Sequence, residues 1–284
     1  METIIGLGNA GCNIAEKFLQ YPQYSVYLLD TDPREHSSAR SYLIEEQKSH
    51  EAYEDTFPDL SNFLSGIKTS CLLVIGGSGA ISGSALRVLQ QLQGQETSVL
   101  YVKPEVELLS QTKKLQDNVV YGVLQEYARS GVLEKFYVVQ NSKLVDILGD
   151  LPVIGYYDKI NNLIAHTIHM TNIFKNSRSV MNTFSGPMPA ARIASFGVLD
   201  LATGSEKPFF DLNLPRERVY YYALNRRKLR EDNNLLKVIT SQVTDKTDGG
   251  LVKASFGIYE TDYDEDYVYS IIYTTMIQKE DTAS

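Results

Sequence analysis

The chain has 284 residues, of which 43% are hydrophobic and 22% are charged, and its formal net charge is −8. This mixture is typical of a folded globular protein, and the length suits two packed domains rather than one small core. The acidic balance argues against direct nucleic-acid binding, which needs a basic surface.

The two cysteines, Cys12 and Cys71, are too few for a disulfide framework. The chain opens with no charged and apolar leader, and no apolar run approaches the 18 residues of a membrane-spanning helix. We therefore expect a protein of the reducing cytoplasm with no membrane segment.

The first half of the chain alternates strand and helix patterns. The expected strands are Thr3–Leu7, Ser25–Leu29, Ser70–Ile75, Ser98–Val102 and Phe136–Val139. The expected helices are Asn13–Gln20, Gly83–Leu92 and Leu108–Ser130, and residues 34–62 read as a mixture of helix and loops. Strands separated by helices predict a parallel sheet, which binds ligands at the carboxyl ends of its strands.

The second half has a different pattern. Apolar residues at helical spacing predict one long, largely buried helix over Tyr156–Lys175. Four strands and one helix then follow: Arg192–Leu199, Arg218–Leu224, the helix Leu229–Thr244, Val252–Tyr259 and Tyr267–Ile277. The fold class is therefore α/β: a Rossmann-like parallel-sheet domain (1–154), a long core helix (155–177), a smaller α+β C-terminal domain with a mixed sheet (178–278) and a short tail (279–284).

The first of two strand–glycine–helix junctions is the segment Gly6–Asn13. Glycines let the backbone turn tightly and approach a ligand, and exposed amides at a helix start attract phosphate. Its G-x-G-x-x-G pattern suggests a dinucleotide site, and Asp30 or Asp32 would suit a ribose hydroxyl. The alternative is a tight turn with no ligand.

The second junction, Gly76–Ser84, has four glycines and three serines in nine positions, which seldom serve packing alone. It contains no lysine, so it is not the G-x-x-x-x-G-K-[ST] phosphate loop. Two phosphate-binding loops on one sheet favour a nucleoside di- or triphosphate over NAD.

Six segments of the chain resemble, in order, those of tubulin and FtsZ. They correspond to the first nucleotide loop with its helix, the glycine-rich signature loop usually written GGTG[ST]G, the start of the ribose-side loop, the loop with a guanine-binding Asn, the core helix and the last strand pair. In this chain they are Gly8–Phe18, Gly76–Gly83, Tyr101–Pro104, Gln140–Leu144, Tyr157–Phe174 and Val252–Ile277. The chain is therefore identified as a short, divergent member of the tubulin/FtsZ superfamily, of the phage or plasmid type.

The resemblance implies GTP or GDP as ligand, with Mg²⁺ as a candidate companion and no metal site of the protein's own. The residues implied along the phosphates are Gly8, Asn9, Ala10, Gly11, Cys12, Gly76, Gly77, Ser78, Gly79 and Ala80. Asn13, Asn141 and Asn161 are implied to face guanine, because an amide both donates and accepts hydrogen bonds. Glu105 or Glu107 is implied to take the ribose. For each Asn the alternative is a helix cap or a turn.

Two departures from the family concern the nucleotide loops. Ile81 stands where the family places the last glycine of its signature loop, and a β-branched residue resists positive φ. The loop must therefore follow another path, or an insertion shifts the helix start. The stretch from Asp32 to Gly76 is also short, and residues 43–58 contain no clear counterpart of the loop that senses the γ-phosphate.

A third departure concerns hydrolysis. In the family, acidic residues after the core helix position the attacking water on the next subunit's nucleotide. The candidate segment here, Val180–Gly186, keeps Asn182 but has no acid, and no Asp or Glu occurs from Lys159 to Leu199. Asn182, Ser185 or His169 could hold a water, although we expect His169 and His166 to be packing or surface residues. Loss of a positioned carboxylate reduces catalysis by a factor of about 10² to 10⁴, so we expect slow or absent hydrolysis.

The leading hypothesis is a GTP-binding protein that assembles with itself head to tail into cytoskeletal filaments or a scaffold, because heterologous contacts build open polymers. A second subunit could supply the missing acid. We expect it in the cytoplasm of a bacterial cell or of a phage-infected host. The alternatives are a non-polymerising guanine-nucleotide-binding regulator and a Rossmann-type NAD-binding oxidoreductase, which explains the first glycine loop but not the second.

Overall fold

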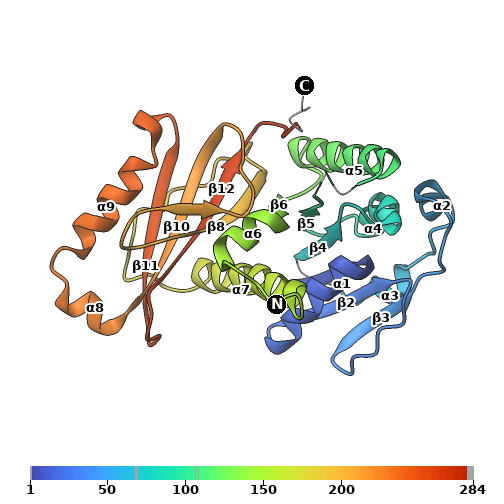
Figure 1. The fold of residues 1–284 in the computed structure, drawn as a ribbon, viewed down its shortest axis with the longest axis horizontal. Coiled ribbons are helices and arrows are strands. Elements are labelled where there is room, and N and C mark those ends of the chain that lie inside the picture. The colour runs from blue at the N-terminus through green and yellow to red at the C-terminus, as the bar shows by residue number, and fades with distance from the viewer. Residues whose placement is uncertain (1, 68–69, 106, 108, 280–284) are drawn as a thin grey trace. The chain divides into compact units, whose positions relative to one another are not determined.

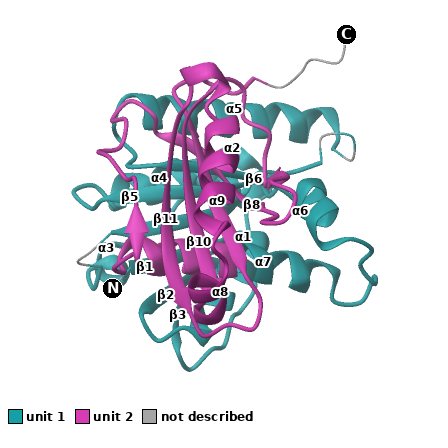
Figure 2. Ribbon diagram, turned by 90° about the vertical axis from the view of Figure 1, so that its left-hand side faces the viewer, with its two compact units in different colours: residues 1–165 teal, residues 166–284 magenta. Residues whose placement is uncertain are grey.

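A computed structural model of the chain describes residues 2–67, 70–105, 107 and 109–279. The chain divides into two compact units, Met1–Ala165 and His166–Ser284, which Figure 2 distinguishes by colour. The division falls inside helix α7 (Tyr156–Lys175), whose bounds match the expected long helix. Of the predicted tail, only Lys279 belongs to the described residues.

The first unit is built on a parallel sheet, as the sequence predicts. Its strand order is β3-β2-β1-β4-β5-β6, and each neighbouring pair is parallel (Figure 1). The strands are β1 (Glu2–Leu7), β2 (Tyr24–Asp30), β3 (Ala39–Leu43), β4 (Cys71–Gly76), β5 (Thr97–Lys103) and β6 (Phe136–Gln140). The connecting helices are α1 (Gly8–Glu16), η1 (Lys17–Gln20), α2 (His50–Asp55), α3 (Ser61–Leu64), η2 (Ala80–Ser84), α4 (Ala85–Gln91), α5 (Gln111–Arg129) and α6 (Asn141–Leu148).

The central strands form where the sequence has continuous apolar runs. Ile4, Ile5, Leu73 and Val74 are fully buried. Side chains that point to both faces of a strand are buried only when helices cover both faces, which is the usual arrangement of a parallel sheet. The central strands are therefore the elements that the sequence predicts most directly.

Four elements of the first unit differ from the prediction. Strand β3 was expected to be helix or loop, because only Ala39 and Tyr42 of its side chains are partly buried and an edge strand carries little apolar signal. Helix α1 begins at Gly8 rather than at Asn13, and α6 was not predicted. Helix α5 begins at Gln111, where Ser110 caps it, whereas the predicted start, Leu108, lies outside the described residues.

The second unit contains the mixed sheet that the sequence predicts. Its strand order is β8-β12-β10-β11-β7, with β9 paired to β8; β10 and β11 are parallel and the other pairs are antiparallel. The strands are β7 (Met181–Asn182), β8 (Ile193–Leu199), β9 (Glu206–Pro208), β10 (Pro215–Asn225), β11 (Lys253–Thr261) and β12 (Tyr267–Thr274).

One predicted helix of the second unit is two helices. The expected segment Leu229–Thr244 divides into α8 (Arg226–Glu231) and α9 (Leu235–Asp245), and a short turn, η4 (Asp248–Gly250), follows them. Asp232 ends α8 with extended backbone, and its carboxylate accepts a hydrogen bond from the amide of Asn234. This local bond competes with helix continuation, as short acidic side chains commonly do.

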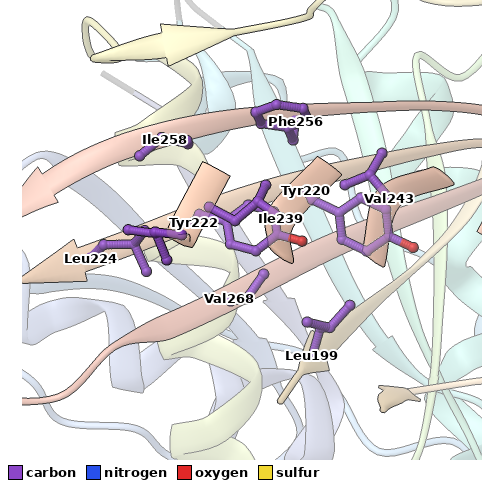
Figure 3. Close-up of a cluster of buried hydrophobic side chains, with 10 residues drawn as sticks. Leu199, Tyr220, Tyr222, Leu224, Ile239, Val243, Phe256, Ile258 and Val268 are labelled. Carbon is purple, nitrogen blue, oxygen red and sulfur yellow. The ribbon is translucent and has the colours of Figure 1, made fainter. Parts of the chain in front are cut away.

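Tyrosines of β10 form much of the second unit's core. Figure 3 shows Tyr220 and Tyr222 beside Ile239 and Val243 of α9 and Phe256 of β11. Their hydroxyl groups bond to Glu206 and Gln242 at 3.1 and 3.3 Å, which satisfies the polar end of a buried ring. Among the described residues, no helix is both long enough and apolar enough to cross a bilayer.

Candidate functional site

The strand register of the first unit places the predicted site segments at one edge of the sheet. Leu7 lies opposite Ile75, Gly76 lies opposite Val102, and Lys103 lies opposite Gln140. The residues that follow these strands therefore start at nearly the same level. This arrangement brings together the segments around Gly8, Gly77, Glu105 and Asn141, at the edge where parallel sheets bind ligands.

The first glycine loop is the uncapped start of α1. Gly8 has a φ of +69°, and Leu7 before it provides no side-chain cap to the helix amides. Gly11 rests directly on β4, since a Cβ added there would lie 2.3 Å from the carbonyl oxygen of Val74. Asn9 and Ala10 are exposed. The first backbone amides of α1 therefore have no capping side chain and lie in an exposed loop, which is the geometry that attracts anions.

Cys12 lies beneath this loop. Its Sγ contacts the carbonyl oxygens of Gly6 and Leu29 at 3.4 and 3.5 Å. Burial, together with the nearby Asp30, raises the pKa of Cys12 to about 12. The side chain is a neutral packing group at physiological pH, so only the backbone of Cys12 is available to a ligand.

The second glycine loop has an inner part and an outer part. Gly77 is buried and its amide donates to the carbonyl of Val102 at 3.0 Å, so that amide is already used by the sheet. Gly79 and Ala80 are exposed, and Ser78 is half-buried. A Cβ added at Gly79 would meet only ordinary contacts, the nearest at 3.8 Å. Protein packing therefore explains why position 77 is glycine but does not explain position 79.

Ile81 links the two loops. A Cβ added at Gly8 would lie 2.5 Å from Cγ2 of Ile81. Ile81 belongs to the 3₁₀ helix η2, and among the described non-glycine residues only Leu214 and Asp248 have positive φ. The loop therefore turns through η2 without requiring positive φ at Ile81, and the isoleucine packs against the first loop instead.

A buried ionic network that the sequence did not reveal lies under the second loop. Asp117 of α5 accepts hydrogen bonds from Tyr101 and Lys103 of β5, at 2.5 and 2.9 Å. The ammonium group of Lys103 also lies 4.1 Å from the ring centre of Tyr121. A Cβ added at Gly77 would lie 2.2 Å from Oδ1 of Asp117, so the network fixes the inner part of the loop.

The residues proposed for the ribose differ in their surroundings. The carboxylate of Glu105 accepts hydrogen bonds from the amide of Ser142 at 2.9 Å and from the side chain of Gln140 at 3.3 Å. It therefore lies at the start of α6, where a negative charge is favourable. Glu107 is exposed. Asn141 is the first residue of α6 and is half-buried.

Two asparagines proposed for guanine lie on helices that are joined by an ion pair. Lys17, one turn beyond Asn13, binds the carboxylate of Asp158 in the first turn of α7. Asn161 follows Asp158 by three residues and is half-buried. Lys17 and Asp158 lie within about one helical turn of Asn13 and Asn161, respectively, so this pair joins the two helical segments that carry them.

Arg34, which the sequence analysis did not single out, connects several polar groups beside the first loop. Its guanidinium donates to Asp30 at 2.8 Å, to Glu16 at 2.9 Å, and to the Oδ1 atoms of Asn9 and Asn13 at 2.7 Å each. The side chain is only 12% exposed. Arg34 follows β2 in a polar segment that looks like an ordinary turn, so the sequence carries no signal that Arg34 joins Asn9, Asn13 and Asp30.

Part of the stretch 43–58, in which we found no clear counterpart of the loop that senses the γ-phosphate, packs on the second loop. The ring of His50 in α2 lies 3.5 Å from the hydroxyl of Ser82, and a Cβ added at Gly83 would lie 2.5 Å from the carbonyl oxygen of His50. Burial lowers the pKa of His50. Residues 50–55 thus lie next to the signature-like loop, a position that the short sequence between Asp32 and Gly76 did not indicate.

The candidate catalytic segment belongs to the second unit and pairs with the edge of its sheet. Val180 and Thr183 donate backbone hydrogen bonds to the carbonyls of Ile258 and Phe256, at 2.7 and 2.9 Å. The side chain of Asn182 is engaged locally: it donates to Ser179 at 2.6 Å and accepts from the amide of Phe184 at 3.3 Å.

The two histidines of α7 are a surface residue, His166, and a packing residue, His169, which are the two roles that we expected for them. A ring nitrogen of His166 lies 3.2 Å from the hydroxyl of Tyr269, and burial lowers the pKa of His166. His169 is buried, and burial together with the neighbouring His166 lowers its pKa to about 4. Among the described residues, no group of three or more His, Cys, Asp and Glu side chains is placed to hold a metal ion.

Comparison with solved structures identifies the fold. TubZ of Bacillus thuringiensis serovar israelensis, in a GTPγS-form protofilament, superposes with a TM-score of 0.75 and 15% identity over 98% of this chain and 87% of TubZ. FtsZ of M. jannaschii, described as an empty dimer, gives 0.73 and 14% over 97% of this chain and 88% of FtsZ. A type III plasmid segregation TubZ gives 0.67 and 16% over 98% and 88%. No protein-family model and no curated protein matches the sequence.

The protein therefore has the fold of the tubulin/FtsZ superfamily, as the order of its motifs predicts. Within that fold, FtsZ and the plasmid-type TubZ proteins are its structural neighbours over nearly the whole chain. At 14–16% identity the likeness establishes the architecture, and the function must be argued from the site.

Proposed function

We propose that this protein binds GTP or GDP at its two glycine loops and assembles head to tail into filaments, with slow or absent hydrolysis. The observation that carries the proposal is the meeting of the uncapped start of α1 with the exposed outer part of the second loop at one edge of a parallel sheet. Both elements offer amides to an anion in the arrangement that suits a nucleotide phosphate.

In this proposal the loop amides of Gly8, Asn9, Ala10 and Gly11, and of Ser78, Gly79 and Ala80, hold the phosphates. The amide of Gly77 does not hold the phosphates in this proposal, because it already donates a hydrogen bond to the sheet. Asn13, Asn141 and Asn161 face guanine, and Mg²⁺ enters with the nucleotide. Residues 1–154 form the nucleotide-binding domain, 155–177 the core helix, 178–278 the second domain and 279–284 the tail.

The sharpest test of the phosphate site uses Gly79. Its backbone is extended, with φ −79° and ψ 137°, and a side chain there meets no close protein atom. Gly79→Val should therefore fold normally but fill the space where the phosphates would lie. We expect GTP and GDP to raise the melting temperature of the wild type by several degrees and that of Gly79→Val hardly at all.

The matched control is Gly122→Ala in α5, which lies outside the proposed site and where an added Cβ meets nothing within 4 Å. It should keep the full response to GTP. A wild type whose melting temperature responds to ATP or NAD but not to GTP would overturn the proposal. Normal GTP binding by Gly79→Val would show that the phosphates do not lie beside Gly79.

The ribose contact is tested by a pair of variants. Glu105→Gln removes a charge at the start of α6, whereas Glu107→Gln alters an exposed carboxylate. If Glu105 binds only α6, its replacement lowers stability by roughly 0.3 to 1 kcal/mol without changing the ratio of GTP to 2′-deoxy-GTP affinity. A change in that affinity ratio for either variant identifies the glutamate that binds the ribose.

Assembly and hydrolysis are measured together. The fold is that of FtsZ and of TubZ, whose solved structures include protofilaments and a two-stranded filament. We expect light scattering to rise when GTP and Mg²⁺ are added, while phosphate release stays about 10² to 10⁴ times slower than that of an FtsZ measured in parallel. Turnover comparable to that FtsZ would contradict slow hydrolysis. Phosphate release that appears only when a second protein is added indicates that a partner subunit supplies the catalytic acid.

One observation favours a second candidate function. The acid-free segment after α7 pairs through its backbone with β11, and its Asn182 is bonded locally. A non-polymerising guanine-nucleotide-binding regulator would retain the binding loops and lose this segment's catalytic groups. Light scattering that stays flat at high protein concentration, with GTP binding intact, would select this alternative. For either function we propose the cytoplasm of a bacterial cell or a phage-infected host.

A further inference from the structure

The cluster around Arg34 suggests how the proposed site distinguishes guanine from adenine. Arg34 donates to the Oδ1 atoms of both Asn9 and Asn13, at 2.7 Å each, and also reaches the carbonyl oxygen of Asn9 at 3.4 Å. Its remaining contacts are with the carboxylates of Asp30 and Glu16. One side chain therefore connects the end of β2 to three positions of α1, Asn9, Asn13 and Glu16.

The contact with Arg34 determines which way each amide points. A guanidinium group has only hydrogen-bond donors, whereas an asparagine side chain has one donor end and one acceptor end. Both asparagines must therefore turn their oxygen atoms toward Arg34. As a consequence, the amino groups, Nδ2, are the ends left for other partners.

The two carboxylates keep Arg34 in place. Asp30 is 3% exposed, and the side chain of Glu16 is 22% exposed. Burial lowers the pKa of Arg34, but its hydrogen bonds to Glu16 and Asp30 more than compensate, so the pKa is raised overall and the charge is retained. Charge-assisted bonds with fixed geometry are stronger and more directional than neutral ones.

The fixed amide of Asn13 has a consequence for base recognition. Guanine and hypoxanthine carry an acceptor oxygen at position 6, whereas adenine carries a donor amino group there. An amide whose oxygen is turned toward Arg34 directs Nδ2 outward, where it donates to a 6-oxo group and opposes a 6-amino group. We propose that Arg34 is a positioning residue that orients the amide of Asn13 and so selects 6-oxopurine nucleotides over adenine nucleotides. This inference rests on the proposed nucleotide site.

The test measures how strongly each variant prefers GTP over ATP. Arg34→Lys keeps a positive charge near Asp30 and Glu16 but cannot reach four partners, and Arg34→Gln has an amide that no longer forces the orientation of Asn13. Affinities for GTP, ITP and ATP are measured by titration of purified protein. We expect the ratio of GTP to ATP affinity to fall about tenfold in both variants, the typical effect of losing one oriented hydrogen bond. The effect should be the same when ITP replaces GTP.

Arg40→Gln is the matched control. Arg40 lies on the neighbouring strand β3, where its guanidinium packs against the hydroxyl and ring of Tyr27 and beside Gly66. Its replacement should leave the GTP to ATP ratio unchanged. Melting temperatures without nucleotide identify any Arg34 variant that fails to fold, and Glu16→Gln then provides a milder perturbation that should lower the ratio less.

The outcomes separate the inference from the function on which it rests. If the wild type binds none of the three nucleotides, the proposed function is wrong. If the wild type prefers GTP and ITP to ATP and the folded Arg34 variants keep that preference, only the positioning role is wrong. If the ratio falls for GTP but not for ITP, recognition depends on the 2-amino group, and the assignment to the 6-oxo group is wrong.

Discussion

The glycine loops of the first unit and the segment 179–186 of the second unit are both irregular stretches, but they are held in different ways. The loops are fixed by side-chain networks, namely Arg34 with its four partners and Asp117 with Tyr101 and Lys103. The segment 179–186 pairs with β11 through backbone bonds, to which the hydroxyl of Thr183 and the ring of Phe184 add contacts. A polar network constrains the positions of its side chains, whereas backbone pairing places the chain without depending on an exposed side chain such as that of Asn182.

This difference agrees with the proposal of a retained binding site and a degenerate catalytic segment. The inner loop positions Gly11 and Gly77 depend on glycine, because an added Cβ would meet the backbone of Val74 or the carboxylate of Asp117. At Asn182, a change of side chain should matter little. The following experiments test this contrast, from the largest expected effect to the smallest.

Replacing Gly11 should have the largest effect. In Gly11→Val the new Cβ would lie 2.3 Å from the carbonyl oxygen of Val74, and the backbone of a central strand cannot move aside. We expect a loss of about 4 kcal/mol or more in the free energy of unfolding, measured by urea denaturation. Gly122→Ala in α5 is the control and should stabilise the protein by roughly 0.5 to 1 kcal/mol. Equal behaviour of the two variants would contradict the close approach at Gly11.

The network under the second loop should give the next largest effect. Asp117→Ala removes the carboxylate that pairs with Lys103, which is 5% exposed. Breaking such a buried pair costs about 3 to 5 kcal/mol. The double replacement Lys103→Met with Asp117→Leu should recover much of this loss, because no buried charge remains. Asp55→Ala, at an exposed position on α2, should change the free energy of unfolding by less than about 0.5 kcal/mol. A small effect of Asp117→Ala would show that the loop does not depend on the pair.

An intermediate effect should appear on acidification. The pKa of His169 is about 4 in the folded protein, below its ordinary value of 6.5, so the unfolded chain binds a proton more readily. The contribution to stability is therefore complete above pH 6.5 and is lost as the pH falls toward 4. We expect a loss of about 2 to 3 kcal/mol, because burial of the His169 ring is the main cause of the low pKa and the neighbouring His166 adds to it. His169→Gln should flatten this part of the profile in chemical denaturation at each pH; an unchanged profile would contradict the assignment.

Asn182→Ala should have the smallest effect. Its side chain is exposed and bonded only within its own turn. We expect a change below about 0.5 kcal/mol in the free energy of unfolding and no change in phosphate release. A marked fall in phosphate release would mean that Asn182 still positions water, and the contrast between the two regions would then fail.

Much of the fold could be predicted from the sequence. The central strands of the first unit, the bounds of α7 and the mixed sheet of the second unit all follow from apolar runs and their spacing. The elements that were missed carry weak local signals. Strand β3 is an exposed edge, α6 starts directly after β6, and the break between α8 and α9 depends on one local bond of Asp232.

The candidate site was predictable in its backbone but not in its side chains. Glycine spacing at strand ends marks where a chain approaches a ligand, and that signal is local. Arg34 and Asp117 acquire their roles from partners that are distant in sequence, such as Asn13, which is 21 residues before Arg34, and Lys103, which is 14 residues before Asp117. Neither residue stands in a recognisable motif.

The sequence by itself determined the class of fold, the places of the two glycine loops and the absence of acids between Lys159 and Leu199. These properties depend on composition, periodicity and residue identity, which do not require distant contacts. Only the tertiary structure decided that the amide of Gly77 belongs to the sheet, that Ile81 packs on Gly8, and that Arg34 turns the amide of Asn13. Hydrogen-bond direction and close approach arise only when separate elements pack together, so no local pattern could have revealed them.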